Sequence, residues 1–325
     1  IRQGVAIAFF IKRGGKRKAD AVVRHADLRG PRESKYGWLE SHDLKQTDWQ
    51  RLEPASPFHL FMPRDNALDA GYRRFVGIPD LFPVNSVGIV TARDGLTIHW
   101  SKEEIWKTVT VFAGMDAEVA RQGYNLGQDA RDWKVSFAQK DLLDSGPSRD
   151  KIAPILYRPF DVRQTYYTGQ SRGFIGQPQQ RVSGQLLAGE NLALITPKRV
   201  EYVGAWQHTF VSSTISDHVV VSLKTIDYQF PLYIYPIADR ADLFSPHETA
   251  ERRPNLNPKV VPALAQAYGV EPSLEEIFHY IYAVLYAPAY REKYAEFLRM
   301  DFPRVPFTAD VKLFRELAVL GERLT

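Results

Sequence analysis

The sequence predicts a mixed α+β fold in which small antiparallel sheets are followed by a C-terminal helical subdomain. Ser101 with Glu104, and Ser273 with Glu276, form two capping boxes, and each precedes apolar residues at helical spacing. Apolar runs with β-branched residues, separated by polar turns, predict short strands in the middle of the chain, at 192–196, 209–213, 219–223 and 230–235. Sheets made of sequential short strands, with helices gathered at one end, are typical of this class.

Length and composition limit the possibilities. The 325 residues are 44% hydrophobic and 12% aromatic, which predicts a globular chain of two or three domains. No apolar run approaches the roughly 20 residues that span a bilayer, so we expect no membrane partner. The chain has no cysteine, which excludes disulfides and thiolate zinc sites and fits a cytoplasmic location. Because it begins at Ile1 without a signal-like segment, we expect it to be cut from a longer polypeptide.

The N-terminal part predicts a hairpin and a connector. The apolar runs at 4–11 and 21–25 read as two strands, and the basic stretch at 12–18 between them reads as a charged turn. That tip could touch phosphates, although a solvated turn is the favoured interpretation. A short element is expected from residue 34, and the region rich in proline and aromatics at 49–63 is expected to be a connector packed on the surface.

A strand with a tight turn is predicted at 88–96, before the helix that Ser101 caps. Phe112-Ala113-Gly114 has the Phe-x-Gly form found in methyl-donor sites. It falls at the end of that helix instead of after an opening strand, so it does not predict a cofactor loop, and we expect no cofactor in this segment.

The stretch at 155–224 is the candidate binding region. Arg158 and Arg163 lie among aromatic and proline side chains, close to Tyr166 and Tyr167. Arginine can pair with two acceptors on a phosphate or a guanine edge, and tyrosine adds rigid contact area with a hydroxyl at its tip. The alternative is a buried aromatic core with arginine stems lying over it.

The strand at 192–196 is expected to deliver Lys198 and Arg199 to its end. Ser216 and His218 are expected at strand ends or in loops of the same sheet, where a rigid frame would hold base-reading groups. The alternative is that these serine- and threonine-rich segments are simply turns. Charge supports a basic face in this region, because residues 151–210 carry 7 Lys/Arg against 3 Asp/Glu. Residues 214–290 reverse the balance, with 5 against 9.

The C-terminal part predicts four helical segments. They follow Asn257-Pro258, Ser273 and Pro288, and the last runs over 309–324. The tyrosines between residues 280 and 294 spread around the helix surface, which favours packing over a ladder for stacking bases.

Catalytic motifs are weak. The eight histidines lack metal-ligand spacing, and no phosphate-binding loop or nucleophile elbow is present. Ser216-Asp217-His218 contains the residue types of a triad, but neighbours along a strand face opposite sides and cannot form one relay. The sequence therefore predicts no catalytic and no metal-binding residue.

An ordered set of motifs resembles the C-terminal specificity region of type ISP restriction-modification enzymes. The run Tyr157-Arg158-Pro159-Phe160-Asp161-Val162-Arg163 carries the resemblance together with the segments at 166–167, 187–192, 230–236, 253–257, 281–285 and 301–306. It covers essentially the whole chain. The resemblance implies double-stranded DNA as partner, read at a short asymmetric site, and a role in phage defence.

The resemblance also implies an upstream adenine-specific DNA methyltransferase domain of the same polypeptide, with S-adenosylmethionine as its cofactor. The strands at 4–11 and 21–28 are similar to the last strands of such a fold. The implied domains are methyltransferase strands at 1–55, a connector at 56–145, a target recognition domain at 146–245 and a helical support at 246–325. The residues expected to contact DNA are Arg158, Arg163, Tyr166, Tyr167, Arg172, Lys198, Arg199, Ser216 and His218.

Two alternatives stay open from the sequence. A protein-interaction scaffold, such as the docking face of a larger complex, would use the acidic helical end as its working surface. A hydrolase or transferase with an unrecognised site is disfavoured, because no nucleophile–base pair stands out.

Overall fold

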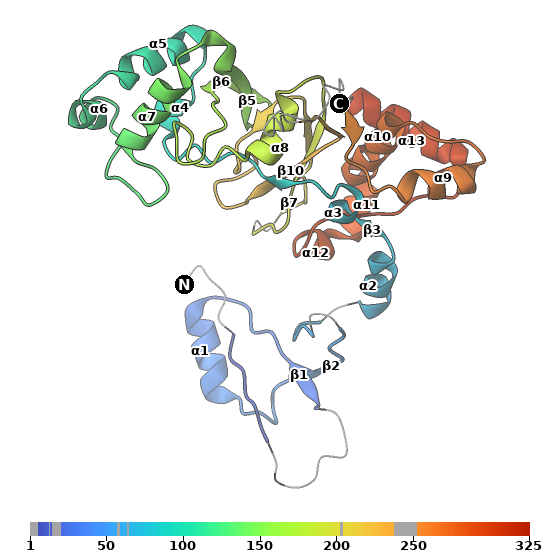
Figure 1. The fold of residues 1–325 in the computed structure, drawn as a ribbon. Helices are drawn as coiled ribbons and strands as arrows, with labels where there is room; N and C mark the ends of the chain where they lie inside the picture. Colours follow the sequence, from blue (N-terminus) through green and yellow to red (C-terminus); the bar gives the residue numbers. More distant parts are fainter. Residues whose placement is uncertain are drawn as a thin grey trace. The chain divides into compact units, whose positions relative to one another are not determined.

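The computed structural model describes residues 6–12, 14, 21–56, 59–63, 65–201, 204–236 and 252–325. The chain forms two compact units, Ile1–Gly71 and Tyr72–Thr325 (Figure 1). Within the described ranges, no helix has both the length and the apolar character needed to cross a membrane.

The first unit has little regular structure. Strand β1 (Val23–His25) pairs antiparallel with β2 (Gln50–Leu52), and helix α1 (Arg32–Ser41) lies between them in the sequence. Helix α1 has no buried residue, and α2 (Asn66–Arg73) begins at the end of this unit.

The hairpin predicted for the N-terminal part is wrong in its pairing, because the partner of β1 is β2. The described part of the predicted first strand, residues 6–11, has no strand assignment and is exposed. Residues 1–5 and most of the basic tip at 12–18 lie outside the described residues. A strand with no covering layer inside its own unit has no burial to hold it in place.

Helices gather at one end of the second unit (Figure 1). They are α4 (Asp94–Thr97), α5 (Lys102–Ala113), α6 (Ala117–Gly123) and α7 (Val135–Ser145), and the short α3 (Ile78–Leu81) precedes them in the chain. The first predicted capping box is confirmed, since the Ser101 hydroxyl accepts from the Glu104 amide at 3.2 Å and the Glu104 carboxylate accepts from the Ser101 amide at 3.0 Å. Phe112, Trp133 and Phe174 are buried in the core that these helices share.

Two sheets occupy the middle of this unit. The first has the order β6 (Asp161–Tyr166), β5 (Ile152–Arg158), β9 (Ile215–Ser216), and the second has the order β4 (Ser86–Val87), β10 (Asp227–Pro231), β7 (Ala193–Pro197), β8 (Phe210–Ser212). Two further pairs join β11 (Tyr233–Ile234) to β12 (Arg253–Pro254) and β13 (Arg304–Val305) to β3 (Val76–Gly77). Short helices in this region are η1 (Arg149–Lys151), α8 (Gln180–Ser183) and η2 (Gly184–Leu186). Apart from the parallel pair β5–β9, these pairings are antiparallel, as predicted.

The strand predicted at 219–223 is wrong. The segment is a turn, in which the Val221 amide donates to the Asp227 carboxylate at 2.9 Å and the Thr225 amide donates to the Ser222 carbonyl at 3.0 Å. These local bonds replace the ladder that a strand would need. The strand predicted at 230–235 is divided between β10 and β11.

The C-terminal end is helical, as predicted. Its helices are α9 (Val260–Tyr268), α10 (Leu274–Tyr286), α11 (Pro288–Lys293), α12 (Ala295–Leu298) and α13 (Val311–Leu324). The second capping box, at Ser273, is confirmed. Helices α10 and α13 cross closely at Gly321, where an added Cβ would lie 1.9 Å from the His279 carbonyl oxygen, so only glycine fits there.

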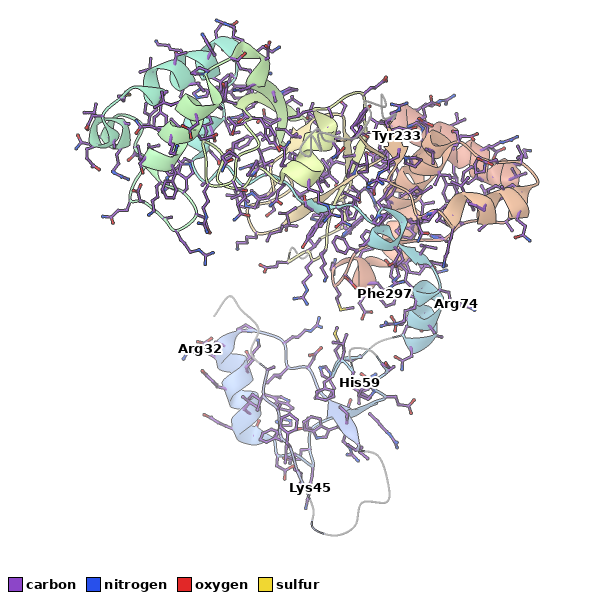
Figure 2. All side chains as sticks on the ribbon, in the orientation of Figure 1. Arg32, Lys45, His59, Arg74, Tyr233 and Phe297 are labelled. Carbon is purple, nitrogen blue, oxygen red and sulfur yellow. The ribbon has the colours of Figure 1, made fainter. Side chains whose placement is uncertain are left out.

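Tyrosines join these helices to the rest of the second unit. The Tyr280 and Tyr290 hydroxyls donate to the carbonyls of Pro306 and Arg304. The ring of Tyr72 stacks on Phe297, with centroids 4.9 Å apart; Phe297 is labelled in Figure 2. Tyr280 and Tyr290 are therefore packing residues, as expected.

Candidate nucleic-acid interface

A bulge shapes the hairpin of β5 and β6. Leu156 pairs with Val162, and Arg158 pairs with Asp161, which leaves Tyr157 as an extra residue on β5. Side chains of neighbouring strand residues normally face opposite sides of a sheet. The bulge breaks this alternation, and the Arg158 guanidinium lies 3.8 Å from the centre of the Tyr157 ring.

Four side chains form a stack on this hairpin, which we call the cation–ring stack: Trp100, Arg163, Tyr157 and Arg158. The Arg163 guanidinium lies 3.9 Å from the Trp100 ring centre and 4.5 Å from that of Tyr157. Trp100 is 69% exposed, so the stack ends at the surface. Flat cations over aromatic faces hold one another in place, which makes this a rigid surface.

Carboxylates of the same chain occupy both arginines of the stack. Arg158 donates to Asp217 at 2.7 Å, and Arg163 donates to Asp161 at 2.8 Å. The Tyr157 hydroxyl donates to Asp94 at 2.8 Å. Both guanidiniums predicted to meet DNA are therefore paired with acidic side chains of the protein itself.

His218 shares the carboxylate that Arg158 uses. Its Nδ1 lies 2.8 Å from Asp217 Oδ1, and Asp217 is only 1% exposed. Burial lowers the pKa of His218, but the hydrogen bond and charge of Asp217 outweigh it, and the pKa is raised overall. The imidazole is thus one more partner of a buried carboxylate.

Lys198 and Arg199 follow β7 at the end of the four-stranded sheet, and both are exposed. The Lys198 ammonium lies 5.9 Å from the ring centre of Phe302. Within the described part of the chain, neither residue has an acidic partner. The predicted position of these two cations at the end of a strand is confirmed, and their contact with DNA stays a prediction.

Arg172 lies in a polar loop that a buried carboxylate fixes. The Asp141 carboxylate accepts from the Thr168 hydroxyl and the Phe174 amide, both at 2.8 Å, and burial raises its pKa. An added Cβ at Gly173 would lie 2.2 Å from that carboxylate. Between these anchors Arg172 is exposed and has a left-handed backbone, with φ of +58°.

A polar hollow of about 400 Å³ borders the Arg172 loop. Its lining includes Arg172, Arg181, Gln177, Gln179, Gln180 and Asp132. Glutamine and arginine side chains are common readers of base edges.

Three residues with predicted DNA contacts are buried. Tyr166 and Ser216 are 0% exposed and Tyr167 is 8% exposed. The Tyr167 hydroxyl donates to the Pro178 carbonyl at 2.8 Å, and the Tyr166 hydroxyl accepts from the Ser148 amide at 2.9 Å. Here the alternative of an aromatic core describes the arrangement, and we leave these three residues out of the interface.

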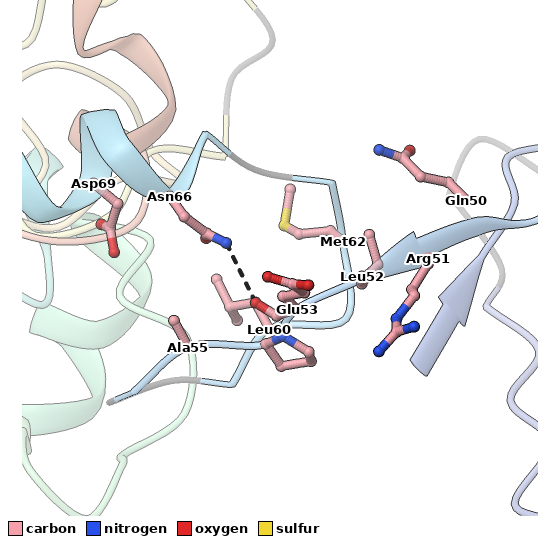
Figure 3. Close-up of a pocket in the computed structure, with 10 residues that line it drawn as sticks. Gln50, Arg51, Leu52, Glu53, Ala55, Leu60, Met62, Asn66 and Asp69 are labelled. Carbon is pink, nitrogen blue, oxygen red and sulfur yellow. Dashed lines mark hydrogen bonds between the residues drawn. The ribbon is translucent and has the colours of Figure 1, made fainter. Parts of the chain in front are cut away.

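The described residues contain no group of three or more acidic or histidine side chains placed to hold a metal ion. Ser216 Oγ has no hydrogen-bond partner, so Asp217 and His218 form no relay with it. The first unit has a small hollow with a volume of about 160 Å³ (Figure 3). At this hollow the Asn66 side-chain amide donates to the Glu53 backbone carbonyl at 3.4 Å. Its lining of mixed charge indicates no particular ligand.

Sequence reasoning missed Trp100, Phe160 and Asp141. Trp100 directly precedes the capping box at Ser101, and nothing local shows that it reaches Arg163. Phe160 follows Pro159 at a turn position where glycine is the usual residue. An aromatic residue at that position in the Arg-Pro-Phe-Asp run was a signal in the sequence that this turn is unusual.

Three solved structures of protein–DNA complexes contain the fold of this chain. A cryo-electron microscopy structure of a DrdV–DNA complex matches 90% of this chain with a TM-score of 0.62 and 24% identity, over 29% of its own length. A nuclease-deletion mutant of the Type ISP restriction-modification enzyme LlaGI, in complex with a DNA substrate mimic, matches 94% with a TM-score of 0.58 and 20% identity. The ATP-dependent Type ISP enzyme LlaBIII bound to DNA matches 85% with a TM-score of 0.58 and 18% identity.

This chain spans 23% of the matched LlaGI chain and 17% of the LlaBIII chain. No curated protein matches it. The family described as the Type ISP C-terminal specificity domain matches residues 80–325, which is most of the second unit. The chain therefore belongs to the Type ISP C-terminal specificity domain family, the family that the motif order in the sequence resembles.

Proposed function

We propose that this chain recognises a short sequence in double-stranded DNA as the specificity part of a restriction-modification enzyme. The observation that carries the proposal is the family match over residues 80–325. The structural neighbours in complex with DNA support it, and so does the pair of exposed cations at the end of β7.

In this proposal Lys198 and Arg199 contact phosphates, and Arg172 reaches the duplex from its clamped loop. Phosphate contacts fix orientation and register, while contacts to base edges give specificity. Arg158, Arg163 and His218 form ion pairs with Asp217 and Asp161. In this proposal they do not contact DNA themselves and affect binding only through the shape that they give to the hairpin.

We propose that residues 1–55 belong to a methyltransferase domain of the same polypeptide and that the rest of that domain covers them. Ile7, Phe10 and Ile11 are 67%, 85% and 79% exposed, and apolar side chains exposed in a row mark a surface that another domain covers. The four domains with boundaries at residues 55, 145 and 245, and a cytoplasmic role in phage defence, belong to the same proposal.

The upstream domain would bind S-adenosylmethionine. The Phe-Ala-Gly segment does not fit that cofactor, because Phe112 is fully buried and Gly114 closes helix α5. Recognition in this chain and methyl transfer in the upstream domain are thus separate tasks.

A duplex library tests the proposal. The protein is incubated with random double-stranded DNA, bound duplexes are sequenced, and the selected site is titrated between about 50 and 200 mM salt. Several Lys/Arg–phosphate contacts should lower the affinity by orders of magnitude over that range. Failure to enrich any sequence would contradict a recognition role.

A further inference from the structure

The turn between β5 and β6 holds an aromatic side chain in an unusual conformation. Pro159 and Phe160 form this two-residue turn, since Arg158 pairs with Asp161 across it. Phe160 has φ of +63°, and its side chain is 92% exposed. The chain thus places a large apolar ring in water at a point that projects from the hairpin.

This conformation has an energetic cost. Proline fixes its own φ near −65°, so the turn cannot be one of the two types that suit hairpins, which need a positive φ at that first position. The positive φ falls on Phe160 instead, where glycine or asparagine is the usual residue. Strain of this kind persists where the surrounding structure imposes it, and it often marks a functional position.

The surroundings do impose it. The ion pair of Arg158 with the buried Asp217 ties the end of β5 to the segment after β9, and the Arg163–Asp161 pair lies within β6 next to the turn. The Phe160 ring meets Phe210 edge to face, with centroids 6.0 Å apart. Phe210 packs in turn against the buried cluster of Leu156, Ile195 and Val220.

The same end of the sheet carries cations and further exposed apolar side chains. Asp227 pairs with Pro197, which brings the turn before β10 next to the end of β7. Leu223 and Ile226 in that turn are 76% and 52% exposed, and Lys198 follows Pro197 directly. Cations beside a projecting ring match a phosphate backbone with stacked bases inside it.

We propose that Phe160 inserts its ring against the base stack of the bound duplex and partly opens one base step. The inference rests on the proposed function and adds a mechanism to it. Apolar wedges between base steps bend or open DNA, which makes binding depend on how easily the contacted sequence deforms. The strained turn would supply such a wedge already fixed in place.

Two variants test the inference. Phe160→Ala removes the ring, and Phe160→Gly removes it and also relieves the strained φ. In the intact protein, both should lower the affinity for the selected duplex by about tenfold, the loss of one stacking contact. Phe160→Gly should at the same time raise the melting temperature, so that stability and binding move in opposite directions.

A base analogue reports insertion directly. The fluorescence of 2-aminopurine at successive positions of the selected site should rise at one step with the wild-type protein and stay low with both variants. Leu143→Ala on α7 is the control, since Leu143 is 60% exposed but belongs to a different element. It should bind and unstack like the wild type.

The outcomes separate the two proposals. If the wild-type protein selects no duplex, the proposed function fails. If it selects a site and Phe160→Ala binds that site equally well, the insertion is wrong while recognition stands. Insertion would also be wrong if Phe160→Ala lowered the affinity while the 2-aminopurine fluorescence was the same with this variant as with the wild-type protein.

Discussion

The hairpin of β5 and β6 and the end of β7 carry the same kind of residues in opposite situations. On the hairpin, Arg158 and Arg163 are paired with carboxylates at 2.7 and 2.8 Å and stacked on rings. At the end of β7, Lys198 and Arg199 are exposed without an acidic partner in the described residues. A cation that is satisfied inside the protein supports the fold, and one that is not can bind a polyanion.

The same contrast holds for two buried carboxylates. Asp217 has Arg158 and His218 as partners, whereas Asp227, which is 0% exposed, leaves its Oδ1 without a hydrogen bond. Burial raises the pKa of Asp227 to about 7. Among the described residues, the buried carboxylate at the sheet end therefore lacks the cationic partners that the one beside the hairpin has.

The largest expected effect is that of Asp227→Asn on stability against pH. A raised pKa favours the protonated carboxyl in the folded state, so its contribution is present below the ordinary value of 3.8 and is lost as pH rises through about 7. The variant should unfold like the wild type near pH 4 and be more stable at pH 8, by on the order of 4 kcal/mol. Urea unfolding of the wild type and of the variant at several pH values measures the difference in the free energy of unfolding. Asp217 and His218 are not substituted in this experiment. Parallel stability curves would show that Asp227 is not buried as described.

Arg158→Ala should destabilise the protein by about 3 kcal/mol, because it leaves the buried Asp217 carboxylate without its closest cation. Urea unfolding at neutral pH measures the loss. The double variant Arg158→Ala with Asp217→Asn should recover part of the stability. If the single variant is as stable as the wild type but binds DNA poorly, Arg158 belongs to the interface and the contrast between the two regions is wrong.

Replacing Lys198 and Arg199 together by Ala should weaken duplex binding by about 10- to 100-fold and reduce the slope of affinity against salt by about 2. Stability should change by less than about 0.5 kcal/mol, since both side chains are exposed. Gel-shift titrations at several salt concentrations test this. Lys312→Ala with Arg315→Ala on α13 removes the same charge elsewhere and should leave both values close to those of the wild type.

Ser216→Ala should have the smallest effect. Ser216 Oγ is buried without a hydrogen bond, so its removal should change stability by less than about 1 kcal/mol, in the stabilising direction. The affinity for the selected duplex should not change. A clear loss of affinity would restore Ser216 as a DNA contact and would mean that the sheet opens on binding.

The sequence predicts local features of this fold well. Both capping boxes, the strands at 192–196 and 209–213 and the helical C-terminal end depend on neighbouring residues, and the structure confirms them. The pairing of β5 with β9 and the ion pair of Arg158 with Asp217 join residues far apart in the sequence. The spacing of apolar residues along the chain does not indicate which distant residues will pair.

The candidate site was predictable in composition and not in arrangement. A run of arginines and aromatic residues has the same appearance whether a given ring lies in the core, like that of Tyr166, or at the surface, like that of Phe160. The bulge at Tyr157 decides which side chains share a face, and bulges depend on the partner strand. Lys198 and Arg199 were easier to place, because a strand end is a local feature.

The loop that Asp141 clamps has a consequence for how specificity can change. Thr168 and Phe174 donate hydrogen bonds to one buried carboxylate and Gly173 lies close against it, while Gln170 to Arg172 between them are exposed. Substitutions in that middle part can therefore accumulate without disturbing the scaffold. A fixed frame with an interchangeable tip would let related enzymes acquire new target sites one residue at a time.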